Sequence, residues 1–200
     1  MRDIQEKRAQ ILSAGLQLMR ARGYNGTGVK DIVDAAGVPK GSFYNYFQSK
    51  EAFAIAAMRQ VAEGNLIQMR RLLVESPDPP TARLLRFFTT NIDHLKREGQ
   101  YQGGCFIGKI CQEMADVNEA IRGAAGDVLA EYEQVFADCL NEACEQGELS
   151  DDLDAGALAG FLFSAWEGAL IRMKTTKNAK PLDDFMLPLR QLLGVSSQLA

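Results

Sequence analysis

The sequence predicts an all-α protein of about nine helices, in which a three-helix head near the amino end precedes a larger helical body. Apolar residues recur at intervals of three and four along most of the 200 residues, and no segment shows the alternating pattern of a strand. Glycine and proline interrupt this periodicity and divide the chain into helices. With 46% hydrophobic residues, the chain is long enough to bury one sizeable core or two small ones.

Residues 1–22 predict the first helix, because six residues form one apolar stripe and the charged residues lie elsewhere. The stripe consists of Ile4, Ile11, Leu12, Gly15, Leu16 and Met19. Gly23 ends this helix and residues 24–28 form a loop. Thr27 is placed to cap the following helix.

Two short helices follow, joined by a glycine turn. Residues 29–36 carry apolar residues at the i, i+3, i+4 and i+7 positions, which predicts a short amphipathic helix. Gly37 directly follows the last of them and suits the left-handed conformation that closes a helix. Pro39 suits the first position of the second short helix, because its φ is fixed and its missing donor would be unpaired there.

The second short helix has two unlike faces. Phe43 and Phe47 lie four residues apart and predict a buried aromatic face. Gly41, Ser42 and Asn45 point the opposite way and present small, hydrogen-bonding groups. Two short helices with such an outer face describe a helix-turn-helix that suits the groove of DNA.

The remaining helices are bounded by caps and prolines. Ser49 caps a long helix from residue 50 to about residue 75, after which residues 76–80 (SPDPP) form a rigid bend. The later helices are predicted over residues 81–97, 105–114, from the Asn118 cap to about 146, from the Asp154 cap to about 174, and 181–193.

The net charge of −4 is unevenly distributed along the chain. Residues 1–60 contain nine Lys/Arg and five Asp/Glu, which gives +4 and leaves −8 for residues 61–200. A basic amino end attracts phosphate, whereas an acidic body avoids the duplex. The charge therefore favours a small DNA-reading head on a larger body with another task.

The segment from Ile32 to Phe53, IVDAAGVPKGSFYNYFQSKEAF, resembles the DNA-binding segment of the tetracycline-repressor (TetR/AcrR) family of bacterial regulators. The shared positions are Ile32, Ala36, Gly37, Val38, Gly41, Ser42, Phe43, Tyr44, Tyr46, Phe47, Lys50, Glu51 and Phe53. The resemblance implies a helix-turn-helix DNA-binding domain over residues 1–53 and a helical effector-binding and dimerisation domain over residues 54–200.

The resemblance also implies which residues meet a palindromic DNA operator. Thr27 and the backbone of Gly28 would contact phosphate, where many members carry a hydroxyl at the position of Gly28. Residues at the second short helix would read base edges and adjacent phosphates, and its flanks would hold the DNA backbone. The first set is Lys40, Gly41, Ser42 and Asn45, and the second is Tyr44, Tyr46 and Lys50.

The helix predicted over residues 154–174 is apolar and rich in small residues, which lets another helix approach closely. Two interpretations stay open: a central core helix, or part of a homodimer interface formed by the last two helices, as the resemblance implies. Dimerisation suits DNA binding, because two-fold symmetry doubles the contact made by one short helix.

The four cysteines include no CxxC pair and His94 is the only histidine, so we expect no metal site. Cys105 differs from the other three because it follows two glycines at a predicted helix start, with Lys109 four residues on. Free amides and a nearby cation favour the thiolate. Branches of the family with a Gly-Cys segment here resemble regulators that respond to oxidants or electrophiles, so we expect Cys105 to be a sensor thiol or a plain buried cysteine.

Phe87, Phe106 and Trp166 line an apolar cavity for an effector or belong to the packed core. We expect a cytoplasmic repressor, released by a small-molecule inducer or by modification of Cys105, with no cofactor, no catalytic residue and no membrane segment. An activator or a non-sensing DNA binder with the same fold is the first alternative. A helical thiol enzyme that uses Cys105 is the second.

Overall fold

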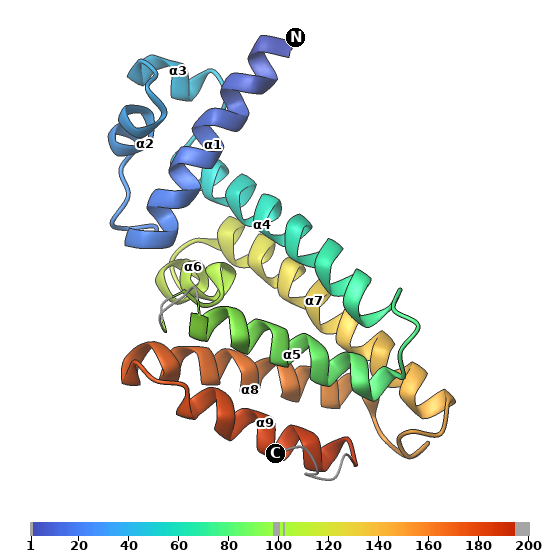
Figure 1. The fold of residues 1–200 in the computed structure, drawn as a ribbon. Coiled ribbons are helices and arrows are strands. Elements are labelled where there is room, and N and C mark those ends of the chain that lie inside the picture. Colours follow the sequence, from blue (N-terminus) through green and yellow to red (C-terminus); the bar gives the residue numbers. More distant parts are fainter. Residues whose placement is uncertain (1, 98–100, 102, 195–200) are drawn as a thin grey trace. The chain divides into compact units, whose positions relative to one another are not determined.

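The computed structural model describes residues 2–97, 101 and 103–194. These residues form nine α-helices and no strand, which confirms the predicted all-α class (Figure 1). The helices are α1 (Arg2–Arg22), α2 (Val29–Ala36), α3 (Lys40–Tyr44), α4 (Lys50–Leu73), α5 (Pro80–Arg97), α6 (Phe106–Met114), α7 (Glu119–Glu145), α8 (Ala155–Thr176) and α9 (Lys180–Leu192).

Side-chain caps begin three of these helices, as predicted. Ser49 Oγ accepts a hydrogen bond from the Ala52 amide at 3.1 Å, and Asn118 Oδ1 accepts one from the Ile121 amide at 2.9 Å. Asp154 Oδ1 accepts from the Ala157 amide at 2.9 Å. Each cap satisfies an amide that has no partner within its own helix.

The predicted helix ends differ from the observed ends by a few residues. Pro39 has an extended ψ of 146° and precedes α3 as its cap, so α3 begins at Lys40 instead of Pro39. The carbonyl of Arg70 accepts from the amides of both Val74 and Glu75, at 2.8 and 3.0 Å. This convergence ends α4 at Leu73, two residues before the predicted end.

The chain forms two compact units. The smaller unit comprises residues 1–63 and 106–128, and the larger comprises residues 64–105 and 129–200. α4 and α7 each contribute to both units, and α6 belongs to the same unit as α1–α3. The division at residues 53 and 54 concerns function and stays a prediction.

Aromatic rings form the base on which α3 rests in the smaller unit. The ring centroid of Phe43 lies 5.5 Å from that of Phe47 and 5.7 Å from that of Phe53, and all three side chains are buried. Gly15 allows α1 to pack closely against Phe53 of α4, because a Cβ at position 15 would lie 2.3 Å from Cζ of Phe53. The packing of these rings fixes the orientation of the short helix α3.

The larger unit has a second aromatic core centred on the buried Phe88. Its ring contacts those of Phe87, Phe136, Trp166 and Phe185 at centroid distances of 4.8–5.5 Å.

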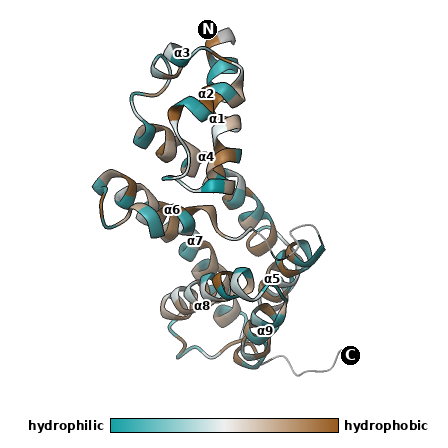
Figure 2. Cartoon of the chain, turned by 90° about the vertical axis from the view of Figure 1, so that its left-hand side faces the viewer, coloured by the Kyte–Doolittle hydropathy of each residue, from teal (hydrophilic) through white to brown (hydrophobic). Residues whose placement is uncertain are grey.

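Hydrophobic and hydrophilic residues are interspersed along most helices (Figure 2). None of the described helices is long and apolar enough to cross a membrane.

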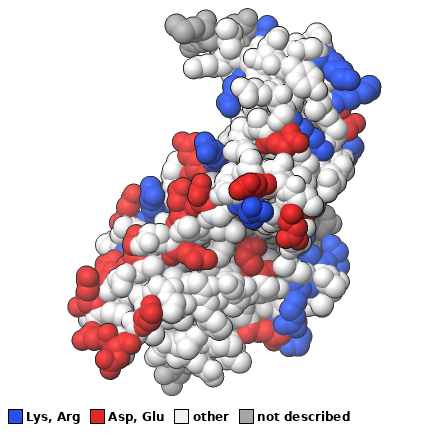
Figure 3. All heavy atoms as spheres, turned by 180° about the vertical axis from the view of Figure 1, so that it is seen from behind, with Lys and Arg blue, Asp and Glu red and all other residues white. Residues whose placement is uncertain are grey.

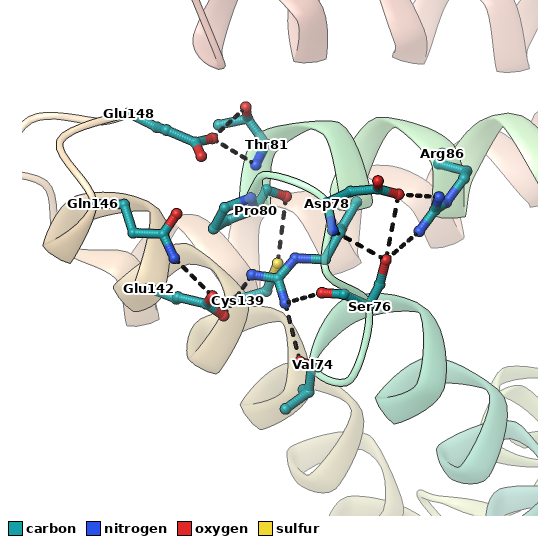
Figure 4. Close-up of polar contacts among 11 residues, drawn as sticks. Val74, Ser76, Asp78, Pro80, Thr81, Arg86, Cys139, Glu142, Gln146 and Glu148 are labelled. Carbon is teal, nitrogen blue, oxygen red and sulfur yellow. Dashed lines mark hydrogen bonds and ion pairs between the residues drawn. The ribbon is translucent and has the colours of Figure 1, made fainter.

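The bend between α4 and α5 is held by polar contacts (Figure 4). Arg83, which is 1% exposed, donates from Nη1 to the carbonyl of Val74 at 3.1 Å, and its Nη2 lies 2.5 Å from Glu142 Oε2. Cys139 Sγ donates to the carbonyl of Pro80 at 3.5 Å, and burial raises the pKa of this thiol to about 12. Cys139 is therefore an inert structural cysteine, as expected of a buried thiol.

Candidate nucleic-acid interface

The turn between α2 and α3 is closed by a pair of hydrogen bonds at Gly37. Gly37 has a φ of +66°, its amide donates to the Asp34 carbonyl, and the Val38 amide donates to the Val33 carbonyl at 3.0 Å. This is a Schellman motif, which satisfies the last carbonyls of a helix. Gln10 of α1 donates from Nε2 to the Ala36 carbonyl at 2.8 Å and thereby ties α1 to the end of α2.

The outer face of α3 is accessible, as the sequence predicted. Lys40, Gly41, Tyr44 and Asn45 are exposed, whereas Ser42 and Tyr46 are partly buried. Tyr44 is 56% exposed although its ring makes an edge contact with the buried Phe43. A Cβ at Gly41 would meet no atom within 4 Å, so packing within the chain does not require glycine there. A bare backbone at this position instead suits a close approach to DNA.

Thr27 does not occupy the position that the sequence predicted. Its side chain is fully buried, and its hydroxyl donates to the Gly23 carbonyl at 2.7 Å. The residue that caps α2 is Gly28, whose amide donates to the Asp31 carboxylate at 2.8 Å. The prediction that Thr27 caps α2 is wrong, and its hydroxyl is not available to a phosphate. The sequence did not reveal the carbonyl that competes for this hydroxyl.

Two of the predicted phosphate contacts have partners within the chain. The amide of Gly28 donates to the Asp31 carboxylate. The ammonium of Lys50 makes a cation–π contact, because it lies 4.1 Å from the centroid of the Tyr24 ring. Burial lowers the pKa of Lys50, and the carboxylates of Glu51 and Glu113 oppose this effect. DNA would have to draw this ammonium away from Tyr24, whereas Lys40 on α3 is exposed.

The charge asymmetry of the sequence is visible on the surface. On the face drawn in Figure 3, many acidic side chains gather over the larger unit, and several basic ones stand on the smaller unit. Lys30 on α2 pairs with Asp34 at 2.8 Å, and this exposed pair offsets the positive charge of Lys30. The positive charge near the turn is therefore carried mainly by other residues, such as Lys40.

The surroundings of Cys105 differ from those that the sequence predicted. It is half-buried and precedes α6, after Gly103 and Gly104, whose φ values are +93° and +118°. The Lys109 ammonium donates to the carbonyls of Arg20 and Ala21, so it is directed toward α1. The expectation that Lys109 activates Cys105 stays a prediction.

Glu167 of α8 is the group that meets Cys105. Burial raises the pKa of Glu167, and a hydrogen bond with Cys105 and the charge of Lys174 oppose that shift. Glu167 is the only acidic residue in α8, and an acid in the middle of an apolar helix is the sequence signal that would have identified it. A carboxylate held against a thiol is positioned to accept the thiol proton.

Tyr132 adds a hydroxyl to the surroundings of Cys105. Its oxygen accepts a hydrogen bond from Asn65 Nδ2 at 2.9 Å. Burial raises the pKa of Tyr132 to about 12, and the hydrogen bond with Asn65 opposes this, while Cys105 and Glu167 add to it. We call Asn65, Cys105, Tyr132, Glu167 and Lys174 the Cys105 cluster, and all five residues belong to the larger unit.

The aromatic residues predicted to line an effector site separate into two groups. Phe87 and Trp166 both contact Phe88 in the aromatic core of the larger unit. Phe106 is buried and belongs to the smaller unit. Among residues 2–97, 101 and 103–194, no group of three or more His, Cys, Asp or Glu side chains is placed to hold a metal ion.

Family comparisons cover both parts of the chain. Residues 11–57 match the family described as "Bacterial regulatory proteins, tetR family". Residues 80–188 match the family described as "Tetracyclin repressor-like, C-terminal domain". The second match alone covers more than half of the 200 residues.

Similar proteins span nearly the whole chain. The transcriptional repressor DhaR of Mycobacterium sp. (strain GP1) is 35% identical over 191 residues, which are 96% of this chain and 94% of DhaR. The transcriptional regulator AcuR of Cereibacter sphaeroides is 34% identical, over 88% of this chain and 80% of AcuR. The crystal structure of reduced Escherichia coli NemR has a TM-score of 0.87 at 25% identity and covers 96% of this chain and 99% of its own. The chain therefore belongs to the TetR family of bacterial regulators and is a DNA-binding transcriptional repressor of the TetR type.

Proposed function

We propose that this repressor binds a palindromic DNA operator as a homodimer, with one α3 helix in each of two major grooves. The observation that carries the proposal is the exposed polar face of α3 on a buried aromatic base. In this arrangement Lys40, Ser42 and Asn45 read base edges and nearby phosphates, while Tyr44 and Tyr46 contact the DNA backbone. The two half-sites lie about 34–36 Å apart or somewhat farther.

The dimer is proposed to form through α8 and α9. Both helices carry exposed large apolar side chains, which are Phe161 and Ile171 on α8 and Leu187 and Leu192 on α9. Gly168 lies between the two on α8, and a Cβ there would meet no atom within 4 Å. An apolar surface with a small residue at its centre suits close packing against the same two helices of a second copy.

The Cys105 cluster is proposed to sense electrophiles. The Cys105 sulfur attacks the electron-poor carbon of an activated alkene, a C–S bond forms and the alkene π bond breaks. The thiol proton passes to the Glu167 carboxylate and from there to the neighbouring carbon, so no oxidant is needed. The adduct adds bulk where Cys105 joins α6, and this favours a state with lower DNA affinity.

The DNA-binding part of the proposal is tested with the full-length protein and a random duplex library. The expected result is recovery of palindromic duplexes and a complex with two chains per duplex. Recovery of no preferred sequence, or of a complex with one chain, would contradict it. Since bacterial DNA lies in the cytoplasm, the proposal also places the protein there.

The sensing part is tested with N-ethylmaleimide and the selected duplex. Wild-type protein should release the duplex after one addition per chain, and Cys105→Ser should keep the duplex bound. Cys111→Ser is the matched control, because Cys111 is also half-buried, and it should respond like the wild type. Unchanged DNA release by Cys105→Ser rules out the sensor. Catalytic turnover of an electrophile without DNA binding would favour the thiol enzyme.

A further inference from the structure

Two side chains of α6 contact the corner between α1 and α2, which we define as residues 20–28. Lys109 and Glu113 lie four residues apart and thus on one face of α6. Lys109 Nζ donates to the carbonyls of Arg20 and Ala21 at 2.8 and 3.2 Å. The Glu113 carboxylate accepts hydrogen bonds from the amides of Tyr24 and Asn25, at 3.1 and 2.8 Å. All these residues lie in the smaller unit.

The charges of these two side chains match the polarity of the backbone that they contact. The carbonyls at the end of α1 carry partial negative charge, which favours the ammonium of Lys109. The successive amides that follow the left-handed Gly23 form a concave donor site, which favours the Glu113 carboxylate. α6 therefore supplies a cation and an anion to adjacent parts of the corner, in the arrangement that stabilises each.

Gly23 is adapted to this contact in two ways. Its φ of +80° lies in the region that favours glycine, and a Cβ would lie 2.0 Å from Glu113 Oε1. A side chain at this position would therefore be strained and would also displace the carboxylate. Although the sequence predicts a helix end at Gly23, the close approach of Glu113 comes from a residue about 90 positions away.

We infer that Lys109 and Glu113 are positioning residues for DNA binding, although neither lies in the helix-turn-helix. Only residues 26–28 separate the amides held by Glu113 from the first turn of α2, and free amides of that turn suit a DNA phosphate. Anchoring the corner at both ends limits the directions in which α2, and α3 after it, can point. This inference concerns residues outside the proposed DNA contacts and does not depend on the sensor role of Cys105.

A purely structural role for the two side chains predicts a different outcome from a positioning role. If they only stabilise the fold, their loss should lower the unfolding temperature and leave the DNA affinity of the folded protein unchanged. If they position the corner, the folded protein should bind DNA more weakly. Conservative replacements that restore the hydrogen bonds should restore the affinity.

The experiment uses full-length variants and the duplex selected by the wild type. Glu113→Ala and Lys109→Met remove the contacts, and Glu113→Gln and Lys109→Arg keep an acceptor or donors. Asp116→Ala is the control, because Asp116 is an exposed acid just after α6. Hydrogen exchange at the amides of Tyr24 and Asn25 reports the contact, fluorescence anisotropy reports DNA affinity, and circular dichroism confirms folding.

We expect Glu113→Ala to raise exchange at the two amides about tenfold and, like Lys109→Met, to weaken DNA binding about tenfold at unchanged helical content. Glu113→Gln and Lys109→Arg should recover most of the affinity, and Asp116→Ala should match the wild type. DNA affinities of folded Glu113→Ala and Lys109→Met within twofold of the wild type would overturn the inference. Hydrogen exchange at the amides of Tyr24 and Asn25 that is as fast in the wild type as in Glu113→Ala would also overturn it. The two failures are distinguishable. If the wild type selects no duplex, the proposed function itself fails, whereas a selected duplex that the variants bind as tightly as the wild type refutes only the role of Lys109 and Glu113.

Discussion

Replacing Gly23 with alanine tests the α6 contact against a natural control in the same unit. Gly23 and Gly37 both end a helix with positive φ, +80° and +66°. A Cβ at Gly23 would lie 2.0 Å from Glu113 Oε1, whereas a Cβ at Gly37 would meet no atom within 4 Å. The two substitutions therefore share the backbone strain and differ in the collision with Glu113.

The expected losses of unfolding free energy follow from the backbone strain and from the collision with Glu113. An alanine in the left-handed conformation costs about 1–2 kcal/mol of unfolding free energy at either position. Displacing Glu113 also removes two hydrogen bonds between a carboxylate and backbone amides, which adds about 1–3 kcal/mol for partly exposed groups. Gly37→Ala should thus cost about 1–2 kcal/mol, and Gly23→Ala about 2–5 kcal/mol.

Urea denaturation at one fixed protein concentration measures these differences, because the stability of a dimer depends on concentration. The series contains the wild type, Gly23→Ala, Gly37→Ala, Glu113→Ala and the double variant Gly23→Ala/Glu113→Ala. Without Glu113, the cost of Gly23→Ala should fall to that of Gly37→Ala. If Gly23→Ala costs the same with and without Glu113, the carboxylate is not seated at the corner and the reasoning is refuted.

Three further substitutions probe other parts of the chain. Gly64→Ala in α4 places its Cβ in open space and should raise the unfolding free energy by about 0.5–1 kcal/mol in the same assay, and a loss would contradict this. Ser49→Ala removes the cap of α4 and should cost about 1 kcal/mol, with no cost as the opposing result. Burial raises the pKa of Glu167 above its ordinary 4.5, so the native state favours the neutral acid more than the unfolded chain does. This contribution to stability is present below pH 4.5 and is lost as the pH rises through the raised pKa. Glu167→Gln should therefore gain stability over the wild type from pH 4 to pH 8, and a constant difference in urea denaturation across that range would refute this.

The local features of the fold could be predicted from the sequence because they depend on neighbouring residues. The caps at Ser49, Asn118 and Asp154 each involve an amide three residues on, and the Schellman motif at Gly37 lies within six residues. The exposed face of α3 follows from the helical period and the buried Phe43. These contacts have a fixed sequence separation, so a pattern can reveal them.

The contacts that the sequence did not reveal join distant segments or depend on a competing acceptor. Glu113 meets Tyr24 and Asn25 across 89 and 88 positions, and Glu167 meets Cys105 across two helices. Helical periodicity places such residues on a face but does not identify the element that packs against it. Thr27 has the residue type of a cap, but its hydroxyl bonds to the nearby Gly23 carbonyl instead.

The central claim is that α3 reads DNA sequence while basic residues supply affinity. Its most direct test is the Kd of the full-length protein for the selected duplex and for a scrambled duplex over a range of salt concentrations. We predict a preference for the selected duplex at every concentration, and Asn45→Ala should abolish this preference while the salt dependence remains. The exposed neighbour Gln48 provides the control Gln48→Ala, which should keep the preference. Equal affinity of the wild type for both duplexes, or a preference that survives Asn45→Ala, would contradict the claim.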